Sequence, residues 1–157
     1  MFDFSNIGMK PRFKDFKPSA TETQLSELES YCENALPEDY KTILTKFNGG
    51  SPESNCFDYL DESSGVLLEG KLGKFFTLDA DKDFPANIWY QIEKFAEYIG
   101  PNALPFADDG LQQIYYLKWV DKIPQVWFLA YLDLDEPEAR IVKSTFPDLL
   151  NGLYNAD

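Results

Sequence analysis

Residues 36–52 read Leu36-Pro37-Glu38-Asp39-Tyr40-Lys41-Thr42-Ile43-Leu44-Thr45-Lys46-Phe47-Asn48-Gly49-Gly50-Ser51-Pro52, and this order predicts one helix with a visible beginning, buried face and end. Pro37 suits the first helical position, where a missing N–H costs nothing, and two acidic residues follow at the positive end of the helix dipole. Asn48-Gly49-Gly50 favours the left-handed conformation that ends a helix, and Pro52 prevents the helix from resuming. The apolar residues recur at the spacing of one helix face: Tyr40, Ile43, Leu44 and Phe47.

Three further helices are expected around this one. Residues 21–24 have the spacing of a capping box, and the apolar face that follows them carries Leu25, Leu28, Cys32 and Ala35. A third helix is expected over residues 85–99, with its face at Ile88, Ile92, Phe95, Ala96 and Ile99. A last helix is expected after Ser144 or Thr145, either of which can cap it, with its face at Phe146, Leu149, Leu150 and Leu153.

Strand-forming runs occupy most of the remaining chain. The expected strands are residues 65–70, 73–78, 104–107, 113–120, 125–132 and 140–143. The runs 113–120 and 125–132 are joined by a short loop, which predicts an antiparallel hairpin. Because both faces of these two runs are apolar, we expect them to be central in the sheet and covered by helices.

The order of these elements predicts an α+β fold in a single domain. A central, mainly antiparallel sheet is expected, flanked by an N-terminal helix pair, a middle helix and a C-terminal helix. Residues 1–20 show no clear period, so we expect an irregular lead-in there and the domain proper over residues 21–157. No apolar run is long enough to span a membrane and the N-terminus lacks the apolar block of a signal peptide, so we expect a cytoplasmic protein.

From about residue 21 to the C-terminus, the order of motifs resembles the SUKH superfamily of bacterial toxin-immunity proteins and fungal cell-wall assembly regulators. The resemblance is carried by Leu36-Pro37-Glu38-Asp39-Tyr40, by Asn48-Gly49-Gly50, by residues 104–110 and by Ser144-Thr145-Phe146. The chain departs from the family at Leu111-Gln112-Gln113, where further glycine and asparagine often follow the Asp-Gly turn. The resemblance implies a domain that binds a partner protein, and it implies no catalytic residues.

The charge of the chain is strongly unbalanced. Its 157 residues include 14 lysines and arginines against 27 aspartates and glutamates, for a formal net charge of −13. Residues 1–18 are slightly basic, so the acidic excess lies in the rest of the chain. Such a body repels nucleic acid and anionic membranes, and it attracts a basic protein partner. On charge alone, an acidic surface that serves only solubility is the favoured interpretation.

Residue types disfavour several kinds of chemistry. The chain has no histidine, which removes Ser-His and Cys-His catalysis and every zinc site that contains histidine. Cys32 and Cys56 form no metal-binding pattern, and Cys32 is expected to be buried and reduced. Asp79, Asp81 and Asp83 imitate the first half of a calcium loop that lacks the required glycine and glutamate. The sequence therefore predicts no metal, no cofactor and no catalytic residue.

Acidic residues in predicted loops and strand ends are the main candidates for a partner-binding site, because side chains there can reach a partner. For any one cluster, a merely solvated surface is the favoured alternative. Trp89 is added as an aromatic anchor because it lies off the apolar face of its helix and because interfaces favour tryptophan. The candidate residues are Asp58, Asp61, Glu62, Asp79, Asp81, Asp83, Trp89, Asp133, Asp135, Glu136 and Glu138.

Three functions follow from these observations, and the first is favoured. An immunity protein would neutralise a cognate toxin, expected to be basic and of the nuclease type, by covering its active cleft with an acidic surface. A regulatory scaffold like the fungal members would bind a signalling or cell-wall partner instead. A carboxylate-based hydrolase would need Asp108 and Asp109, but the missing histidine weakens it and an Asp-Gly turn explains these residues better. The sequence carries no signal of an oligomeric state.

Overall fold

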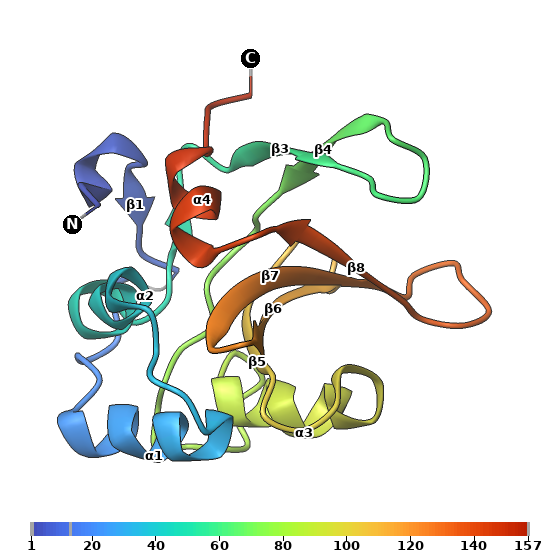
Figure 1. Cartoon of the computed structure of the whole chain (residues 1–157). Helices are drawn as coiled ribbons and strands as arrows, with labels where there is room; N and C mark the ends of the chain where they lie inside the picture. The colour runs from blue at the N-terminus through green and yellow to red at the C-terminus, as the bar shows by residue number, and fades with distance from the viewer. Residues whose placement is uncertain (1, 13, 157) are drawn as a thin grey trace.

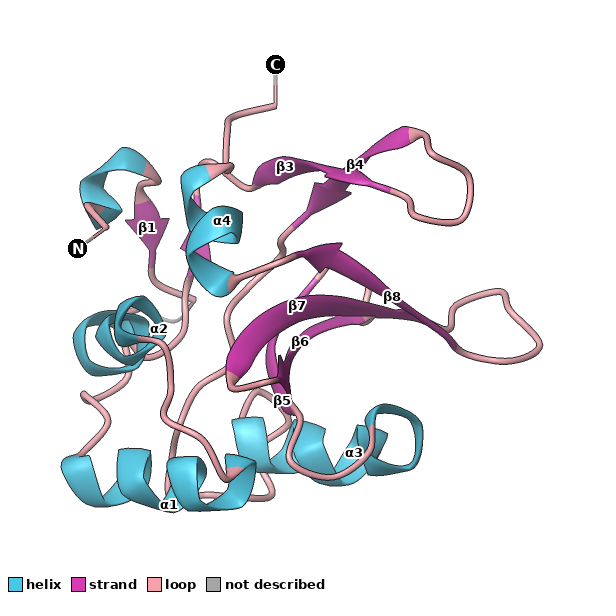
Figure 2. Cartoon of the chain, viewed as in Figure 1, coloured by secondary structure: helices cyan, strands magenta, loops and turns pink. Residues whose placement is uncertain are grey.

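A four-stranded antiparallel sheet lies at the centre of the molecule (Figures 1 and 2). The computed structural model describes residues 2–12 and 14–156 and confirms the expected single-domain α+β fold. In chain order its elements are η1 (Phe4–Asn6), β1 (Met9–Lys10), α1 (Glu22–Cys32), α2 (Glu38–Thr42), η2 (Ile43–Phe47), β2 (Ser51–Pro52), β3 (Cys56–Leu60), β4 (Leu67–Lys71), α3 (Ile88–Ile99), β5 (Leu104–Asp108), β6 (Ile114–Val120), β7 (Ile123–Ala130), β8 (Glu138–Lys143) and α4 (Phe146–Asn151). The central strands follow the order β5-β6-β7-β8, while β1–β2 and β3–β4 form two small antiparallel sheets.

The helix pair at the N-terminal end forms as expected. Thr21 and Gln24 make a complete capping box, because the Gln24 N–H donates to the Thr21 hydroxyl at 3.1 Å and the Thr21 N–H donates to the Gln24 amide oxygen at 2.9 Å. Pro37 is the N-cap of α2 and not its first helical residue, one position from the expected place. The helix then widens into a π-helical turn over η2, which the Asn48 N–H closes by donating to the Ile43 carbonyl at 2.7 Å.

The two later helices also match their patterns, with one shifted boundary. Asn87 caps α3 by accepting from the Trp89 N–H, so the helix begins after Pro85 and not at it. Thr145 caps α4, with a proline in the first turn as expected. Among the described residues, no helix is long and apolar enough to cross a membrane.

The expected hairpin of the central sheet is present as β6 and β7. Asp121 and Lys122 form its two-residue turn with φ of 51° and 66°, the left-handed pair that suits the twist of the flanking strands. The first four residues of β6 are buried, as expected for a covered central strand. β7 is covered less completely than expected, because Trp127 and Phe128 stay half-buried.

The second hairpin differs from the expectation. β3 was not predicted, because Cys56–Leu60 carries an aspartate between its apolar residues. β3 pairs with β4, and residues 73–78 form only isolated bridges. Residues 73–76 nevertheless cover the outer edge of β5, because the Gly73 N–H donates to the Asp108 carbonyl at 2.7 Å and the Phe76 N–H to the Phe106 carbonyl at 2.9 Å. A side chain at Gly73 would collide with the Asp108 carboxylate and the Gly110 backbone.

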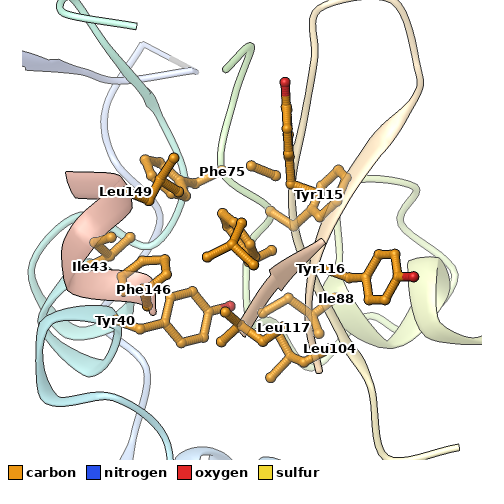
Figure 3. Packing of buried hydrophobic residues seen from close by; sticks show 14 of the residues in the cluster. Tyr40, Ile43, Phe75, Ile88, Leu104, Tyr115, Tyr116, Leu117, Phe146 and Leu149 are labelled. Atoms are coloured by element: carbon orange, nitrogen blue, oxygen red, sulfur yellow. The ribbon is translucent and has the colours of Figure 1, made fainter. Parts of the chain in front are cut away.

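Aromatic rings join the helices to the sheet at the centre of the core (Figure 3). The Phe146 ring of α4 meets the Tyr40 ring of α2 at 5.5 Å and the Phe106 ring of β5 at 5.3 Å, both edge to face. The three rings are fully buried, so one cluster holds the opening helix, the last helix and a sheet strand together. Within the lead-in, Phe4 and Ile7 are also buried against this core.

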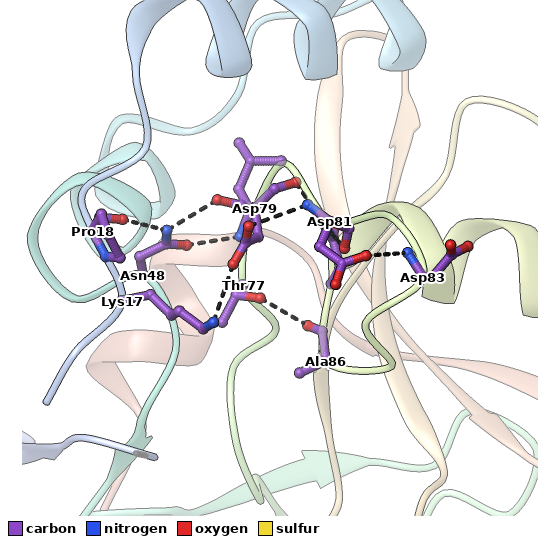
Figure 4. Close-up of polar contacts among 10 residues, drawn as sticks. Lys17, Pro18, Asn48, Thr77, Asp79, Asp81, Asp83 and Ala86 are labelled. Atoms are coloured by element: carbon purple, nitrogen blue, oxygen red, sulfur yellow. Dashed lines mark hydrogen bonds and ion pairs between the residues drawn. The ribbon is translucent and has the colours of Figure 1, made fainter. Parts of the chain in front are cut away.

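Asn48 joins three segments that are distant in sequence (Figure 4). Its side chain is buried, and its φ of 46° lies in the left-handed region expected at the end of the helix. The amide nitrogen donates to the Pro18 carbonyl at 2.7 Å and to the Leu78 carbonyl at 3.0 Å. The amide oxygen accepts from the Leu78 N–H at 2.7 Å. One side chain therefore holds the lead-in, the end of η2 and the segment before α3 in place.

Replacing Asn48 should destabilise the protein strongly. Asn48→Ala removes the side-chain partner of three backbone groups, of which the two at Leu78 are buried, so we expect a loss of about 3 kcal/mol in the free energy of unfolding, measured by urea denaturation. Asn48→Gly is the second variant, because glycine adopts the left-handed conformation without strain and the measured loss then comes from the missing side chain alone. Asn155→Ala, at an exposed position, is the matched control. A loss below about 0.5 kcal/mol in both Asn48 variants would contradict this role.

Removing the Tyr40 hydroxyl should not destabilise the protein, in contrast to removing the Asn48 side chain. This hydroxyl is fully buried and has no hydrogen-bond partner among the described residues, and burial raises the pKa of this side chain well above its usual value. Tyr40→Phe should therefore leave stability unchanged or raise it by about 1 kcal/mol in urea denaturation. Tyr115→Phe is the control that should lose about 1 kcal/mol, because the Tyr115 hydroxyl bonds both backbone groups of Lys71. Equal losses in the two variants would show that Tyr40 has a partner.

Candidate functional site

A groove separates the β3–β4 hairpin from β8 and α4. Its volume is about 610 Å³, and its apolar lining comes from Tyr59, Leu60 and Leu67 of the hairpin and Ile141 and Val142 of β8. Toward the tip of the hairpin a second hollow of about 640 Å³ continues it. Glu62 and Ile141 line both hollows, so the two make one continuous surface, called here the hairpin groove.

Carboxylates outnumber cations along the hairpin groove. Its lining includes two cationic side chains, Arg140 and Lys143, and five carboxylates, those of Asp58, Asp61, Glu62, Glu138 and Asp148. Arg140 is already engaged, because its guanidinium lies 3.6 Å from the Glu138 carboxylate. The groove therefore carries a net negative charge along an apolar floor, which suits a basic partner.

The tip of the hairpin holds the Asp61 carboxylate in the charged form. The Ser64 hydroxyl donates to the Asp61 carboxylate at 2.7 Å, and the Ser63 hydroxyl donates to it at 3.1 Å. These hydrogen bonds, with the nearby charge of Arg140, lower the pKa of Asp61. Asp61 consequently stays ionised at neutral pH.

A pair of carboxylates stands on the hairpin beside the groove. Asp58 of β3 lies directly opposite Glu69 of β4, an arrangement that destabilises a sheet by like-charge repulsion. The Tyr154 hydroxyl lies 2.7 Å from the Asp58 carboxylate and 3.1 Å from the Glu69 carboxylate. These hydrogen bonds raise the pKa of Tyr154, so the hydroxyl stays a donor that offsets part of the repulsion. Two adjacent acceptors of this kind suit a lysine or arginine side chain from outside.

Large apolar side chains stand exposed on the same hairpin. Leu60, Val66 and Leu67 are 56%, 52% and 66% exposed, although Leu60 and Leu67 occupy paired strand positions. The hairpin is therefore apolar at its surface where it borders the acidic groove. An exposed apolar patch rimmed by polar groups is typical of a protein interaction site.

β8 is the open edge of the central sheet. Residues 73–76 cover the opposite edge, at β5, but in residues 2–12 and 14–156 no backbone hydrogen bond joins the outer side of β8 to another segment. The unpaired N–H and C=O groups of an edge strand can pair with a strand from another chain. β8 thus offers backbone partners along one wall of the hairpin groove.

The structure brings some of the predicted site residues together and separates others. Asp58, Asp61, Glu62 and Glu138 all line the hairpin groove, although they come from two clusters that are distant in sequence. Asp133, Asp135 and Glu136 lie outside the lining, in the exposed loop between β7 and β8. In Figure 1 this loop and the tip of the β3–β4 hairpin project on the same side of the molecule. Asp58 lies within β3, whereas a loop or a strand end was expected.

The cluster Asp79, Asp81 and Asp83 lies elsewhere, in the loop before α3 (Figure 4). Asp79 pairs with the Lys17 ammonium at 3.2 Å, and it accepts from the Asp81 N–H at 3.2 Å. Asp81 in turn accepts from the Asp83 N–H at 3.1 Å. Asp79 and Asp81 therefore bind their own loop, which fits the expected acidic turn.

Trp89 packs against its own chain. Its ring meets the Tyr31 ring edge to face at 5.7 Å, and the Lys82 ammonium lies 5.0 Å from the ring centre. These two contacts come from α1 and from the loop before α3, and Trp89 lines neither hollow of the hairpin groove. Its role as a partner-binding anchor stays a prediction.

The side chains considered for catalysis either hold the backbone in place or are buried. The Asp108 carboxylate accepts from the Lys74 and Gly110 N–H groups, each at 3.0 Å, and fixes the turn after β5. Cys32 and Cys56 are buried free thiols, and burial raises the pKa of Cys32 to about 12, opposite to an activated nucleophile. Within the part of the chain that the structure describes, no group of three His, Cys, Asp or Glu side chains is placed to hold a metal ion.

Sequence reasoning missed Leu60, Leu67 and Ile141 in the lining of the groove and Tyr154 beside it. Leu67 stood in a run expected to be a strand, but nothing in the run shows which face is exposed. Tyr154 follows the last helix, and its position beside the hairpin depends on a backbone pairing with Cys56, which is distant in sequence. Such contacts have no local signature.

One family model matches this chain. The SMI1 / KNR4 family (SUKH-1) matches residues 19–152, which covers the central sheet, the helices α1 to α4 and the hairpin groove. No curated protein and no solved structure matches the chain.

Proposed function

This chain belongs to the SMI1 / KNR4 family (SUKH-1), and on that premise we propose that it is an immunity protein that binds and neutralises a basic toxin. Domains of this family bind partner proteins and act as immunity or regulatory proteins. The observation that carries the proposal is the hairpin groove, where exposed apolar side chains meet five carboxylates. Neutralisation is by occlusion, because the surface that carries the hairpin groove lies over the toxin's active cleft in the complex.

The two kinds of side chain in the groove have separate roles in binding. Leu60 and Leu67 supply apolar area that is removed from water when a partner covers it. The carboxylates steer a basic partner toward the groove and raise the rate of association. A toxin that holds a nucleic-acid substrate is basic at its active cleft, because its substrate is a chain of phosphates.

The surroundings of the groove can add contacts to a complex. A specific interface buries about 1,600 Å² in total, more than the groove offers alone. The adjacent β7–β8 loop extends the acidic rim with Asp133, Asp135 and Glu136. The open edge of β8 can add a strand of the partner to the central sheet. In this arrangement the groove is the centre of the interface and the loop is its rim.

We expect the cognate toxin to be encoded beside this gene, and charge reversal in the groove should slow its binding. Glu62→Lys is exposed in the groove, so we expect association at low salt to slow about 10-fold by surface plasmon resonance, with a weaker dependence on salt. Asp83→Lys is the matched control, because it makes the same change in the acidic loop before α3 and should slow association less than about twofold. Equal slowing by both variants would mean that only net charge matters.

Co-expression tests the immunity function itself. The wild-type chain and Asp83→Lys should protect cells against the neighbouring toxin, while a variant that combines Glu62→Lys with Leu67→Asp should not. Both changed residues are exposed, so the variant should unfold at the wild-type temperature. Recovery of a kinase or a wall synthase from the native host, with no toxin protected against, would favour the regulatory scaffold instead.

A further inference from the structure

Trp127 stands at the border of the hairpin groove, on the strand β7 that lies beside the open edge strand β8. Its side chain is half-buried and lines the second hollow together with Asp61, Glu62 and Glu138. Ile141 of β8 lies directly opposite Trp127 in the strand register, so the two side chains are neighbours on one face of the sheet. A large aromatic ring therefore stands next to the open edge and its carboxylates.

The central sheet itself fixes the orientation of this ring. The Trp127 indole N–H donates to the Gln125 amide oxygen at 3.1 Å, and the indole stacks beside the Tyr116 ring with the ring centres 6.4 Å apart. The Lys118 ammonium lies 4.7 Å from the centre of the Trp127 ring. A side chain that is already fixed loses little conformational entropy when a partner covers it, which favours Trp127 as an anchor for binding.

The face of the sheet around Trp127 suits apolar side chains of a partner. Lys118 already supplies the cation that an indole ring attracts, and it would repel a second one. Ile141 is half-buried and Ala139 is exposed, and both share this face because side chains two positions apart on a strand point the same way. A partner side chain gains most here by removing apolar surface from water.

The opposite face of β8 lies on the side of the hairpin. Side chains alternate along a strand, so Glu138 and Arg140 point to the face opposite the apolar one. Phe128 lies directly opposite Arg140, and its ring meets the Tyr115 ring at 4.7 Å. The Tyr115 ring in turn meets the Phe57 ring of β3 at 5.6 Å. The β3–β4 hairpin therefore packs on the face of the sheet that carries Glu138 and Arg140.

Negative charge dominates on this second face. The Arg140 guanidinium lies 3.6 Å from the Glu138 carboxylate, so its positive charge is already offset. Asp61 and Glu62, at the tip of the hairpin, add two more carboxylates to the same hollow. A segment that lies along the edge of β8 consequently meets apolar side chains on one face and carboxylates on the other.

We propose that the partner adds one amphipathic strand to the edge of β8, with apolar side chains on the Trp127 face and basic side chains on the hairpin face. A strand presents this alternation naturally, because its successive side chains point to opposite faces. The outer backbone groups of β8, unpaired in the described chain, supply the hydrogen bonds, and Trp127 is the anchor. This inference rests on the proposed function for the identity of the partner, and it names the segment by which a basic toxin is bound.

Two synthetic peptides test this binding mode without the toxin. The probe is the end-blocked peptide Lys-Val-Lys-Val-Lys-Val-Lys, and its control is Lys-Lys-Val-Val-Val-Lys-Lys, which has the same composition and charge. In NMR titrations of the full chain at constant ionic strength, the alternating peptide should shift the β8 amides and the Trp127 indole N–H. It should bind about 5-fold more tightly than the control peptide, because only the alternating order separates the two kinds of side chain on a strand. Absence of saturable binding, or equal binding of both peptides, would overturn the proposal.

Substitutions of tryptophan test the anchor. Trp127→Thr removes the ring but keeps a residue that favours strands, so it should weaken binding of the alternating peptide about 10-fold. Trp127→Phe keeps an aromatic ring and should bind within about threefold of the wild type. Trp89→Thr is the matched control, because it makes the same change in a half-buried tryptophan outside the groove, and it should have an effect below about twofold. Equal weakening by Trp127→Thr and Trp89→Thr would contradict the anchor.

Two exposed alanines provide variants that leave the fold intact. Ala139→Lys places a cation on the apolar face of β8 and should weaken the alternating peptide about 10-fold. Ala80→Lys makes the same change in the acidic loop before α3 and should have an effect below about twofold. Equal binding by these two variants would overturn the proposal. If the peptides behave as expected but no toxin binds, the proposed function alone fails; if a toxin binds but the peptides do not, this inference alone fails.

Discussion

The buried amide of Asn48 is the interaction on which the arrangement of this fold depends. Asn48 ends the opening helix in a left-handed conformation, and that conformation aims its side chain at the backbone of Pro18 and Leu78. The glycines that follow let other segments approach closely. A side chain at Gly50 would meet the Lys10 carbonyl at 2.5 Å. The Asn-Gly-Gly motif therefore has one physical role, which is to bring three distant segments together where the helix stops.

This junction determines which edge of the sheet is covered. Leu78, held by Asn48, lies just after residues 73–76, which cover the outer edge of β5. β8, at the other edge, keeps its outer backbone groups unpaired in the described chain and borders the β3–β4 hairpin. The central sheet is thus covered at its β5 edge and uncovered at its β8 edge. The open side also carries exposed leucines, which a protein without a partner there would have little reason to keep in water.

Much of the fold could be predicted because its signals are local. The capping box at Thr21, the left-handed stop at Asn48 and the cap at Thr145 each depend on residues a few positions apart. β3 could not be predicted in this way, since its pairing with β4 gives it the strand conformation. For the same reason, residues 73–78 form only isolated bridges in place of a regular strand.

The candidate site was only partly predictable. Composition indicated an acidic binding surface, and four of the proposed residues do line one groove. Their convergence depends on the approach of the hairpin to β8, which no local pattern encodes.

The central claim is that the hairpin groove is the surface that binds the toxin. Amide hydrogen exchange of the full chain, with and without the cognate toxin that we propose for it, tests this claim most directly. The account predicts slower exchange in β8 and in the β3–β4 hairpin when the toxin is bound, with little change in α1 and in residues 79–83. Protection confined to α1 and residues 79–83, with unchanged exchange in β8 and the hairpin, would contradict it.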